Sequence, residues 1–410
     1  MRTKFGLIIF LLISNFSICF GQEKTKQNYF MGYKKVGQGL VFHDTIDNSF
    51  KIKIGIRFQT LFNNVWTVKN DNIGQVGQHT PEILIRRARF KMDGSFLKNK
   101  IYFKFELGLS PRDIRGGDDF EHGNTASIIL DAFVGWNINK NFWLQVGQGK
   151  LPGNRERLIS SGSLEFVDRS LLNSRFNIDR DIGVQIGHKW KKGNFFMKEI
   201  IHISKGEGRN VIATGNSGLN YTGKIEIYPM GEFTKKGDYF AMDLLREEKP
   251  KLAIATAFNF NNNAIRERGQ LGDFIKDAND NYFGKNHYQL FADLMFKYKG
   301  FSIMTEYAQR WTNGSSIVMD DSSNVIGTVY TGKALNVQMG YVTKSNFGFS
   351  LRYTGNDPDS DVGTNVHMYT FCFSKFFFGH KLKIQSDFSY LQNISKDDNM
   401  WWRLQVEFHL

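Results

Sequence analysis

The sequence predicts an all-β fold, a sixteen-stranded antiparallel up-and-down transmembrane β-barrel, from three observations. Apolar and polar residues alternate along the chain, long connections alternate with short ones, and aromatic residues make up 15% of the sequence. A period of two places successive side chains on opposite faces of a strand. One face of each predicted strand is therefore apolar and the other polar, as in a barrel with lipid outside and water inside.

The segment from Phe50 to Phe62 illustrates the alternation, because Ile52 and Ile54 alternate there with Lys51 and Lys53. Comparable segments recur to the end of the chain, and most have the length that a tilted strand needs to cross a membrane, about ten residues. We predict that sixteen strands begin near residues 49, 83, 100, 127, 142, 180, 194, 219, 251, 287, 301, 333, 347, 366, 381 and 400.

The connections between these segments predict which end of the barrel faces outward. Those after odd-numbered strands are mostly long, at 63–82, 110–126, 152–179, 205–218, 262–286 and 312–332, whereas most of those after even-numbered strands are short. This alternation favours long extracellular loops and short periplasmic turns. The long connection 230–250 is an exception, because a turn is due there. A soluble β-sandwich also has alternating strands, but it explains neither this pattern nor the aromatics on the apolar parity.

The N-terminus predicts export from the cytoplasm. Arg2 and Lys4 precede an apolar stretch from Phe5 to Phe20, and Gly21 completes a small-residue cleavage site, as in a secretory signal peptide. We therefore expect a signal peptide at 1–21, a periplasmic leader at 22–48 and a barrel at 49–410. The formal net charge is +13. An exported chain rarely meets nucleic acid, so the excess charge favours attraction of small anions.

The sequence lacks the motifs of familiar enzymes, including Gly-x-Ser-x-Gly, His-Glu-x-x-His and Cys-x-x-Cys. Its nine His show no metal-ligand spacing. We therefore predict no catalytic residues, no metal site and no cofactor.

Several stretches, taken in order, resemble the phosphate-selective porin O and P family in the version common in Bacteroidetes. They are Ile85–Arg89 with Gly94, Leu130–Val134, Val146–Pro152, Gly206–Asn210, Ile227–Phe233 and Gly379–Lys383. The resemblance covers nearly the whole mature chain. It implies a sixteen-stranded outer-membrane porin, often a homotrimer, whose lumen favours anions such as phosphate.

Polar residues of the alternating pattern should line the pore. Basic residues outnumber acidic ones at these positions, and they are densest on the first three strands at Arg57, Arg87, Arg89, Lys91 and Lys104. Arginine's planar fork suits phosphate and carboxylate oxygens. An equally open reading is that these cations pair with Asp93, Glu106 and Asp131 to brace the barrel wall.

The connection 152–179 is the candidate constriction loop, because it is long enough to fold inward and carries Arg155, Arg157, Arg169 and Arg175. If it stays at the rim instead, these charges form only a solvated surface. The function we expect is passive diffusion of small, preferentially anionic solutes. A non-conducting barrel for surface assembly or adhesion and an outer-membrane barrel enzyme are the alternatives.

Overall fold

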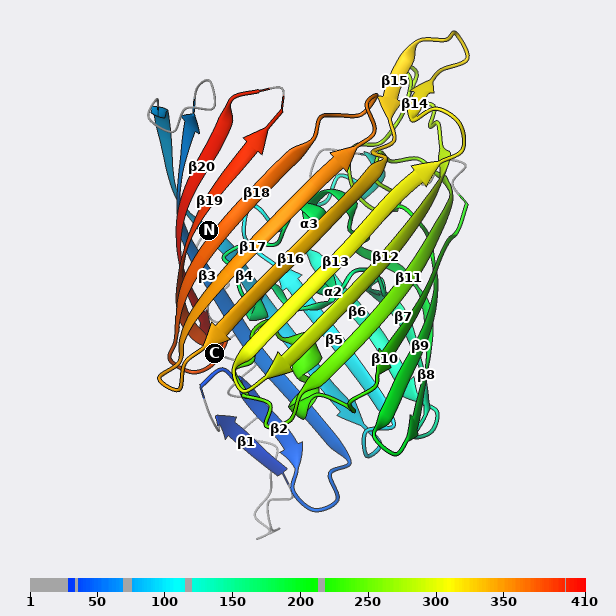
Figure 1. Cartoon of the computed structure of the whole chain (residues 1–410). Coiled ribbons are helices and arrows are strands. Elements are labelled where there is room, and N and C mark those ends of the chain that lie inside the picture. The colour runs from blue at the N-terminus through cyan, green and yellow to red at the C-terminus, as the bar shows by residue number, and fades with distance from the viewer. Residues whose placement is uncertain (1–28, 34–35, 69–75, 115–119, 213–217, 395) are drawn as a thin grey trace, which may run out of the picture.

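The computed structural model describes residues 29–33, 36–68, 76–114, 120–212, 218–394 and 396–410. Within them, sixteen strands form one closed antiparallel barrel (Figure 1). These are β3 (Phe50–Val68), β4 (Val76–Phe96), β5 (Ile101–Gly108), β6 (Ile129–Asn137), β7 (Phe142–Lys150), β8 (Arg180–Lys192), β9 (Phe195–Ser204), β10 (Asn220–Tyr228), β11 (Lys251–Ala264), β12 (Lys285–Tyr298), β13 (Phe301–Thr312), β16 (Gly332–Val342), β17 (Phe347–Pro358), β18 (Val366–Phe376), β19 (Leu382–Asn393) and β20 (Asp398–His409). The predicted signal peptide at 1–21 lies outside the described residues.

The barrel closes between its last and first strands. Consecutive strands pair with antiparallel neighbours, and β20 pairs with β3 from Asp398 opposite Val68 to His409 opposite Arg57. Closure leaves no free edge among the sixteen strands, so every strand has a partner on each side. The predicted sixteen-stranded antiparallel barrel is therefore confirmed.

Two rims can be distinguished by their connections. The loop rim carries 109–114, 120–128, 151–179, 205–212, 218–219 and 265–284, and also the hairpin of β14 (Ile317–Met319) and β15 (Val325–Thr328), at the top of Figure 1. The turn rim carries 97–100, 138–141, 193–194, 299–300 and 343–346. At that rim, β1 (Tyr29–Tyr33) and β2 (Leu40–Asp44) form a hairpin within the predicted leader, and β2 pairs with the start of β3.

Strand β10 shows how the two faces differ. Thr222, Lys224 and Glu226 are buried and point into the barrel, whereas Tyr221 and Ile225 are exposed on its outer surface. The polar parity is the inward one, so hydrogen bonds and ion pairs satisfy its buried groups. The apolar parity forms the outer surface, which suits contact with lipid.

The strands β3 and β4 extend beyond their predicted ends. The predicted connection 63–82 is mostly strand, because residues 60–66 of β3 pair with residues 79–85 of β4 and also with β20. The wall is therefore taller on this side. Polar residues such as Asn63 and Asn64 lie in this extension and interrupt the apolar alternation, so the sequence pattern did not predict these residues as strand.

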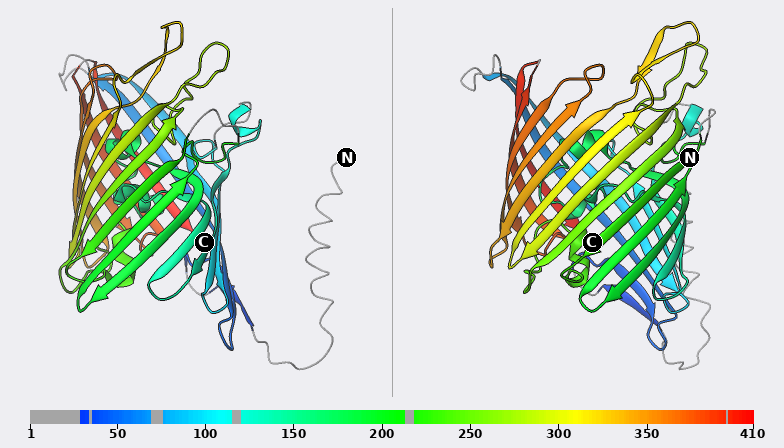
Figure 2. Two further views of the ribbon diagram at one scale, coloured as in Figure 1. Left: turned by 90° about the vertical axis from the view of Figure 1, so that its right-hand side faces the viewer. Right: turned by 45° about the vertical axis from the view of Figure 1, so that its right-hand side comes forward.

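The interior of the barrel is partly filled. Residues 151–179 fold into it and carry two short helices, α2 (Arg155–Leu158) and α3 (Leu171–Phe176), which lie inside the cylinder in both views of Figure 2. The exceptional connection 229–250 folds inward from the turn rim. It meets the first segment where the amide of Ala241 donates to the carbonyl of Ser163 at 2.9 Å.

Candidate functional site: a basic cavity in the barrel

Residues 151–179, here called the inner loop, are attached to one side of the wall by apolar contacts. Leu172, Phe176 and Ile178 pack against Phe291 of β12 and against inward-facing alanines of β11, β13 and β16. A second cluster joins Ile159 and Leu164 to residues of β9–β13 and of 229–250. A large apolar side chain gains roughly 1.5–3 kcal/mol on full burial, so these contacts hold the inner loop against β9–β16.

Charged groups reinforce the same attachment. The Arg155 guanidinium is buried, with its Nε 2.5 Å from Oδ1 of Asp293 and an Nη 3.6 Å from Oε1 of Glu226. The amide of Glu156 donates to the Glu306 carboxylate at 2.7 Å. Removing one partner of a buried pair typically costs about 3–5 kcal/mol where the other charge is left unpaired. Lys224, 3.2 Å from Asp293, and Lys198, 3.3 Å from Glu226, would remain beside these carboxylates without Arg155.

Two acidic residues tie the loop to the strands from β16 round to β4. Glu165 accepts hydrogen bonds from Gln338 and Ser350, each at 2.9 Å, and burial raises its pKa to about 7. Asp168 lies against Arg86 and Arg87 of β4, at 3.0 and 3.3 Å. Burial raises the pKa of Asp168, but these two guanidinium groups outweigh it and hold that pKa well below its ordinary value.

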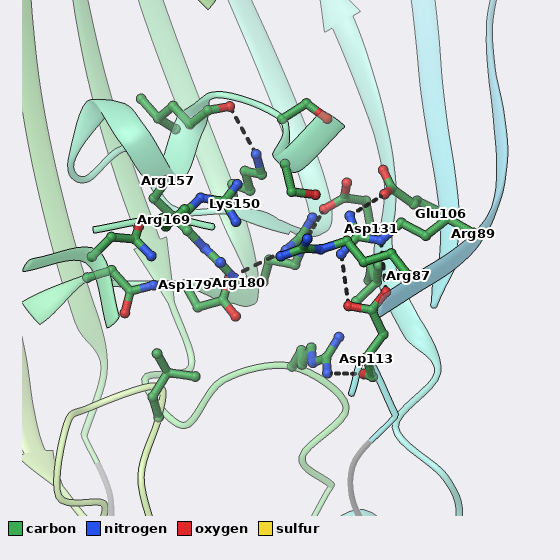
Figure 3. Close-up of a pocket in the computed structure, with 18 of the residues that line it drawn as sticks. Arg87, Arg89, Glu106, Asp113, Asp131, Lys150, Arg157, Arg169, Asp179 and Arg180 are labelled. Atoms are coloured by element: carbon green, nitrogen blue, oxygen red, sulfur yellow. Dashed lines mark hydrogen bonds and ion pairs between the residues drawn. The ribbon is translucent and has the colours of Figure 1, made fainter. Parts of the chain in front are cut away.

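Opposite the attached side, a cavity of 880 Å³ lies between the inner loop and strands β4–β8. Its lining reaches from Arg112 and Arg268 in connections of the loop rim to Trp143 near the turn rim. Among the described residues, thirteen basic ones border it: Arg86, Arg87, Arg89, Lys91, Lys104, Arg112, Lys150, Arg157, Arg169, Arg180, Arg209, Arg268 and Arg403. Five acidic residues do so: Glu106, Asp113, Asp131, Asp168 and Asp179. Positive charge therefore predominates around the cavity. Figure 3 shows part of this lining.

Most of the predicted pore-lining residues border this cavity, namely Arg87, Arg89, Lys91 and Lys104 from the wall and Arg157 and Arg169 from the inner loop. Arg57 and Arg155 do not. Arg57 is buried beneath the inner loop, 2.5 Å from Glu407 and 2.8 Å from Ser161 Oγ. Arg175 is exposed beside Tyr330, and its carbonyl accepts from Arg310. The alternation predicts which residues face inward, but it does not predict which of those residues the inner loop covers.

The wall cations also form the bracing network that the sequence left open. Arg89 donates to both oxygens of Asp113 at 2.9 and 3.0 Å, and to Glu106 at 3.0 Å. Lys104 pairs with Asp131 and, at 3.0 Å, with Glu106. Bracing and lining therefore coexist, because cations outnumber the carboxylates that pair with them.

Arg86 is a cavity residue that the sequence analysis missed. Gln59 pairs with Arg87 while Thr60 pairs with Ile85, so Arg86 has no opposite residue on β3. This irregularity is a β-bulge, which inserts one extra residue and shifts the alternation. Arg86 and Arg87 consequently both turn inward. The sequence did contain a signal for the bulge. Ile85 and Ala88 are three residues apart, so both can face outward only if the strict alternation is interrupted between them.

Lys150 and Arg180 were missed as well, at the two points where the inner loop leaves β7 and enters β8. Lys150 Nζ donates to the carbonyls of Leu158 and Ile159 at 2.9 and 3.3 Å, and Arg180 Nε is 2.7 Å from Asp131. Both lie close to Arg157 and Arg169 in Figure 3. Strand ends carry no dependable alternation, so periodicity gave no face for either residue.

Crowding of like charges is evident in the inner-loop arginines. Burial, together with Arg89 and Arg180, lowers the pKa of Arg169 to about 10 despite Glu156 nearby. The pKa of Arg157 is lowered well below its ordinary value by burial and by Arg169, Arg180, Arg209 and Arg89. A bound anion would relieve this repulsion.

Across the described ranges, no group of three or more His, Cys, Asp or Glu side chains is placed to hold a metal ion. In the same part of the chain, no helix is long and apolar enough to cross a membrane.

Comparison with known proteins assigns the family. Residues 52–342 match the family described as phosphate-selective porin O and P. The chain belongs to this family. It is therefore an outer-membrane porin, a channel for passive diffusion, and the family favours a channel over an enzyme.

Solved structures share the fold at low identity. A loop L8 deletion mutant of OmpT, an outer membrane protein of Vibrio cholerae, matches with a TM-score of 0.54 and 10% identity over 88% of this chain and 100% of that chain. An anion-selective porin from Comamonas acidovorans matches with a TM-score of 0.53 and 10% identity over the same shares. No curated protein matches the sequence. At such identities the likeness concerns the barrel fold alone.

Proposed function

We propose that this porin prefers anions and that they pass through the basic cavity between the inner loop and β4–β8. The observation that carries the proposal is the excess of cations at the cavity surface, thirteen basic against five acidic residues. A passage lined by one sign of charge and walled by protein raises the local concentration of the opposite ion. The family name and the anion-selective porin of the same fold agree with this direction.

Within the cavity, we assign anion contact to Arg87, Arg89, Lys91 and Lys104, to Arg157 and Arg169, and to Arg86, Lys150 and Arg180. The Nε atoms of Arg86 and Arg87 are buried without a hydrogen-bond partner. Arg169 donates to the carbonyls of Glu156 and Ile159, and no ion pair joins it to a described carboxylate. Unused guanidinium donors suit tetrahedral oxyanions, so phosphate is the solute we propose. Arg57 and Arg155 instead anchor the inner loop.

We further propose the placement of the barrel in the cell. The loop rim faces the exterior and the turn rim the periplasm, residues 1–21 are removed as a signal peptide, residues 22–48 stay in the periplasm, and the protein forms a homotrimer in outer-membrane lipid. The inner loop is the constriction. A cysteine introduced at Ser322, on the β14–β15 hairpin, should react with an impermeant maleimide on intact cells, whereas one at Ser345 in a turn should react only after lysis. The reverse labelling would overturn the orientation.

Ion substitution tests the anion preference. Channels reconstituted in planar bilayers should lose most of their conductance when chloride is replaced by a bulky sulfonate, and much less when potassium is replaced by a bulky ammonium ion. Larger dependence on the cation would refute the proposal. Phosphate is tested separately, because millimolar phosphate should reduce chloride current if it binds the arginines, and an unchanged current would remove phosphate from the assignment.

A further inference from the structure

The cavity has an aromatic side that inorganic anions do not require. On the inward face of β5–β7, the rings of Tyr102, Phe133 and Trp143 form what we call the aromatic panel. Phe133 and Trp143 line the cavity itself. All three side chains are partly exposed although they point inward, so part of each ring is in contact with the lumen.

Glycines beneath the rings explain why they lie along the wall. The inward positions Gly135, Gly149 and Gly187 face the panel, and Gly135 and Gly187 are directly opposite Tyr102 and Trp143 in register. A Cβ at Gly135 would overlap the Tyr102 ring, and one at Gly187 would overlap the Trp143 ring. A Cβ at Gly149 would lie 3.2 Å from the Phe133 ring. The glycines therefore leave room for rings against the backbone, and this side of the lumen stays open.

Cations border the panel. Lys104 is directly opposite Phe133 in register, and Lys189 Nζ lies 5.0 Å from the ring centroid of Trp143. Across the cavity from the wall, Tyr239 of the connection 229–250 contributes another ring. The combination of aromatic rings with one ammonium group over a ring and another beside it is complementary to a planar apolar group that carries a carboxylate.

We propose that the panel and its lysines bind organic anions with a planar ring, such as an aromatic carboxylate, on their way through the pore. This inference rests on the proposed anion preference and specifies the solute class further. The carboxylate interacts with Lys104 and with the arginines that border the cavity, while the ring stacks on Phe133 or Trp143 and displaces water from their faces. A small inorganic anion uses the cations alone.

A pair of blockers isolates the contribution of the ring. Benzoate and cyclohexanecarboxylate carry the same charge and have similar size, but only benzoate is flat. In single-channel recordings of chloride current, benzoate should block at a concentration roughly two- to tenfold below that of cyclohexanecarboxylate, the range expected for one aromatic contact. Equal blocking concentrations in the wild-type channel would overturn the inference.

Matched variants then locate the effect. Trp143→Leu should reduce the benzoate preference toward unity, and Phe133→Leu gives a second, independent reading if the first variant assembles poorly. Trp190→Leu is the control, because Trp190 is on β8 but faces outward and is 42% exposed. A benzoate preference that persists in both panel variants, or that is lost equally in the control, contradicts the panel. A cation-preferring wild-type channel would instead refute the proposed function, so the two failures are distinguishable.

Discussion

Neutralising Arg169 should lower the anion preference of the pore without removing the pore. This side chain borders the cavity, and its guanidinium is held by backbone carbonyls of Glu156 and Ile159 rather than by a carboxylate. Arg169→Gln therefore removes a positive charge that no described ion pair balances. By contrast, replacing Arg89 would also release Glu106 and Asp113, which would confuse the result.

The size of the effect follows from Coulomb's law. An ion passing about 8 Å from a unit charge in water interacts with it by about 0.5 kcal/mol. Removing the charge takes this favourable energy from a passing anion and removes an equal unfavourable energy from a passing cation. The anion-to-cation permeability ratio should therefore fall about sixfold without screening, and about twofold at 0.1 M salt, where the Debye length is about 10 Å. In 1 M salt, where that length is about 3 Å, the difference should nearly vanish.

Reversal potentials at both salt concentrations measure this ratio. The control is Lys333→Gln, which removes one positive charge from an exposed position where Lys333 pairs with Asp357 outside the cavity. A ratio that is unchanged in Arg169→Gln, or that falls equally in Lys333→Gln, would refute the reasoning. A fall that persists undiminished in 1 M salt would mean that the loop had moved and that electrostatics was not the cause.

Three further predictions concern the inner loop and the wall. Arg155→Leu removes one of the two cations beside Asp293 and one of the three beside Glu226, so it should weaken the attachment of the loop by less than the roughly 3–5 kcal/mol typical of a fully unpaired buried charge, about 1–3 kcal/mol. The weakened attachment should appear as a larger and noisier single-channel conductance, whereas the conductance of Arg175→Leu, at the exposed end of α3, should be unchanged. Burial raises the pKa of Glu165 in the folded protein to about 7. The free energy that protonated Glu165 contributes to folding is therefore present in full below pH 4.5 and is lost as the pH rises through 7. The loss of folding free energy amounts to roughly 3 kcal/mol. Channel noise should therefore rise between pH 4.5 and 7 in the wild type and stay constant in Glu165→Gln. Gly187→Ala should force the Trp143 ring into the lumen and reduce conductance, and the double variant with Trp143→Ala should restore it; no recovery would show that the ring is not the obstruction.

Much of the barrel was predictable because the same physical rule applies to every strand. Lipid on one side and water on the other impose a period of two, and fifteen of the sixteen predicted starts lie within two residues of the observed ones, such as 142, 180 and 251; the exception is β4, predicted near 83 and observed from Val76. The period of two fails where strand residues lie outside the part of the wall with lipid on one face, or where a bulge adds a residue. Residues 63–68 and 76–82 pair beyond the apolar pattern, and the bulge at Arg86 shifts the parity within β4.

The arrangement of the lumen was less predictable, because it depends on contacts between segments far apart in sequence. The inner loop lies on β9–β16, where inward positions such as Ala257, Ala308 and Ala334 are small and Phe291 is apolar. Apolar residues on the polar parity were the available signal for this docking. The loop leaves the glycine-lined β6–β8 side open, and that choice decides which predicted arginines border the cavity and which, like Arg57, are buried beneath the loop.

The most direct test of the account is the reversal potential of the wild-type channel in a tenfold potassium chloride gradient across a planar bilayer. The excess of basic residues around the cavity predicts a potential displaced toward the equilibrium potential of chloride. A potential displaced toward that of potassium would contradict the central claim that these cations govern passage.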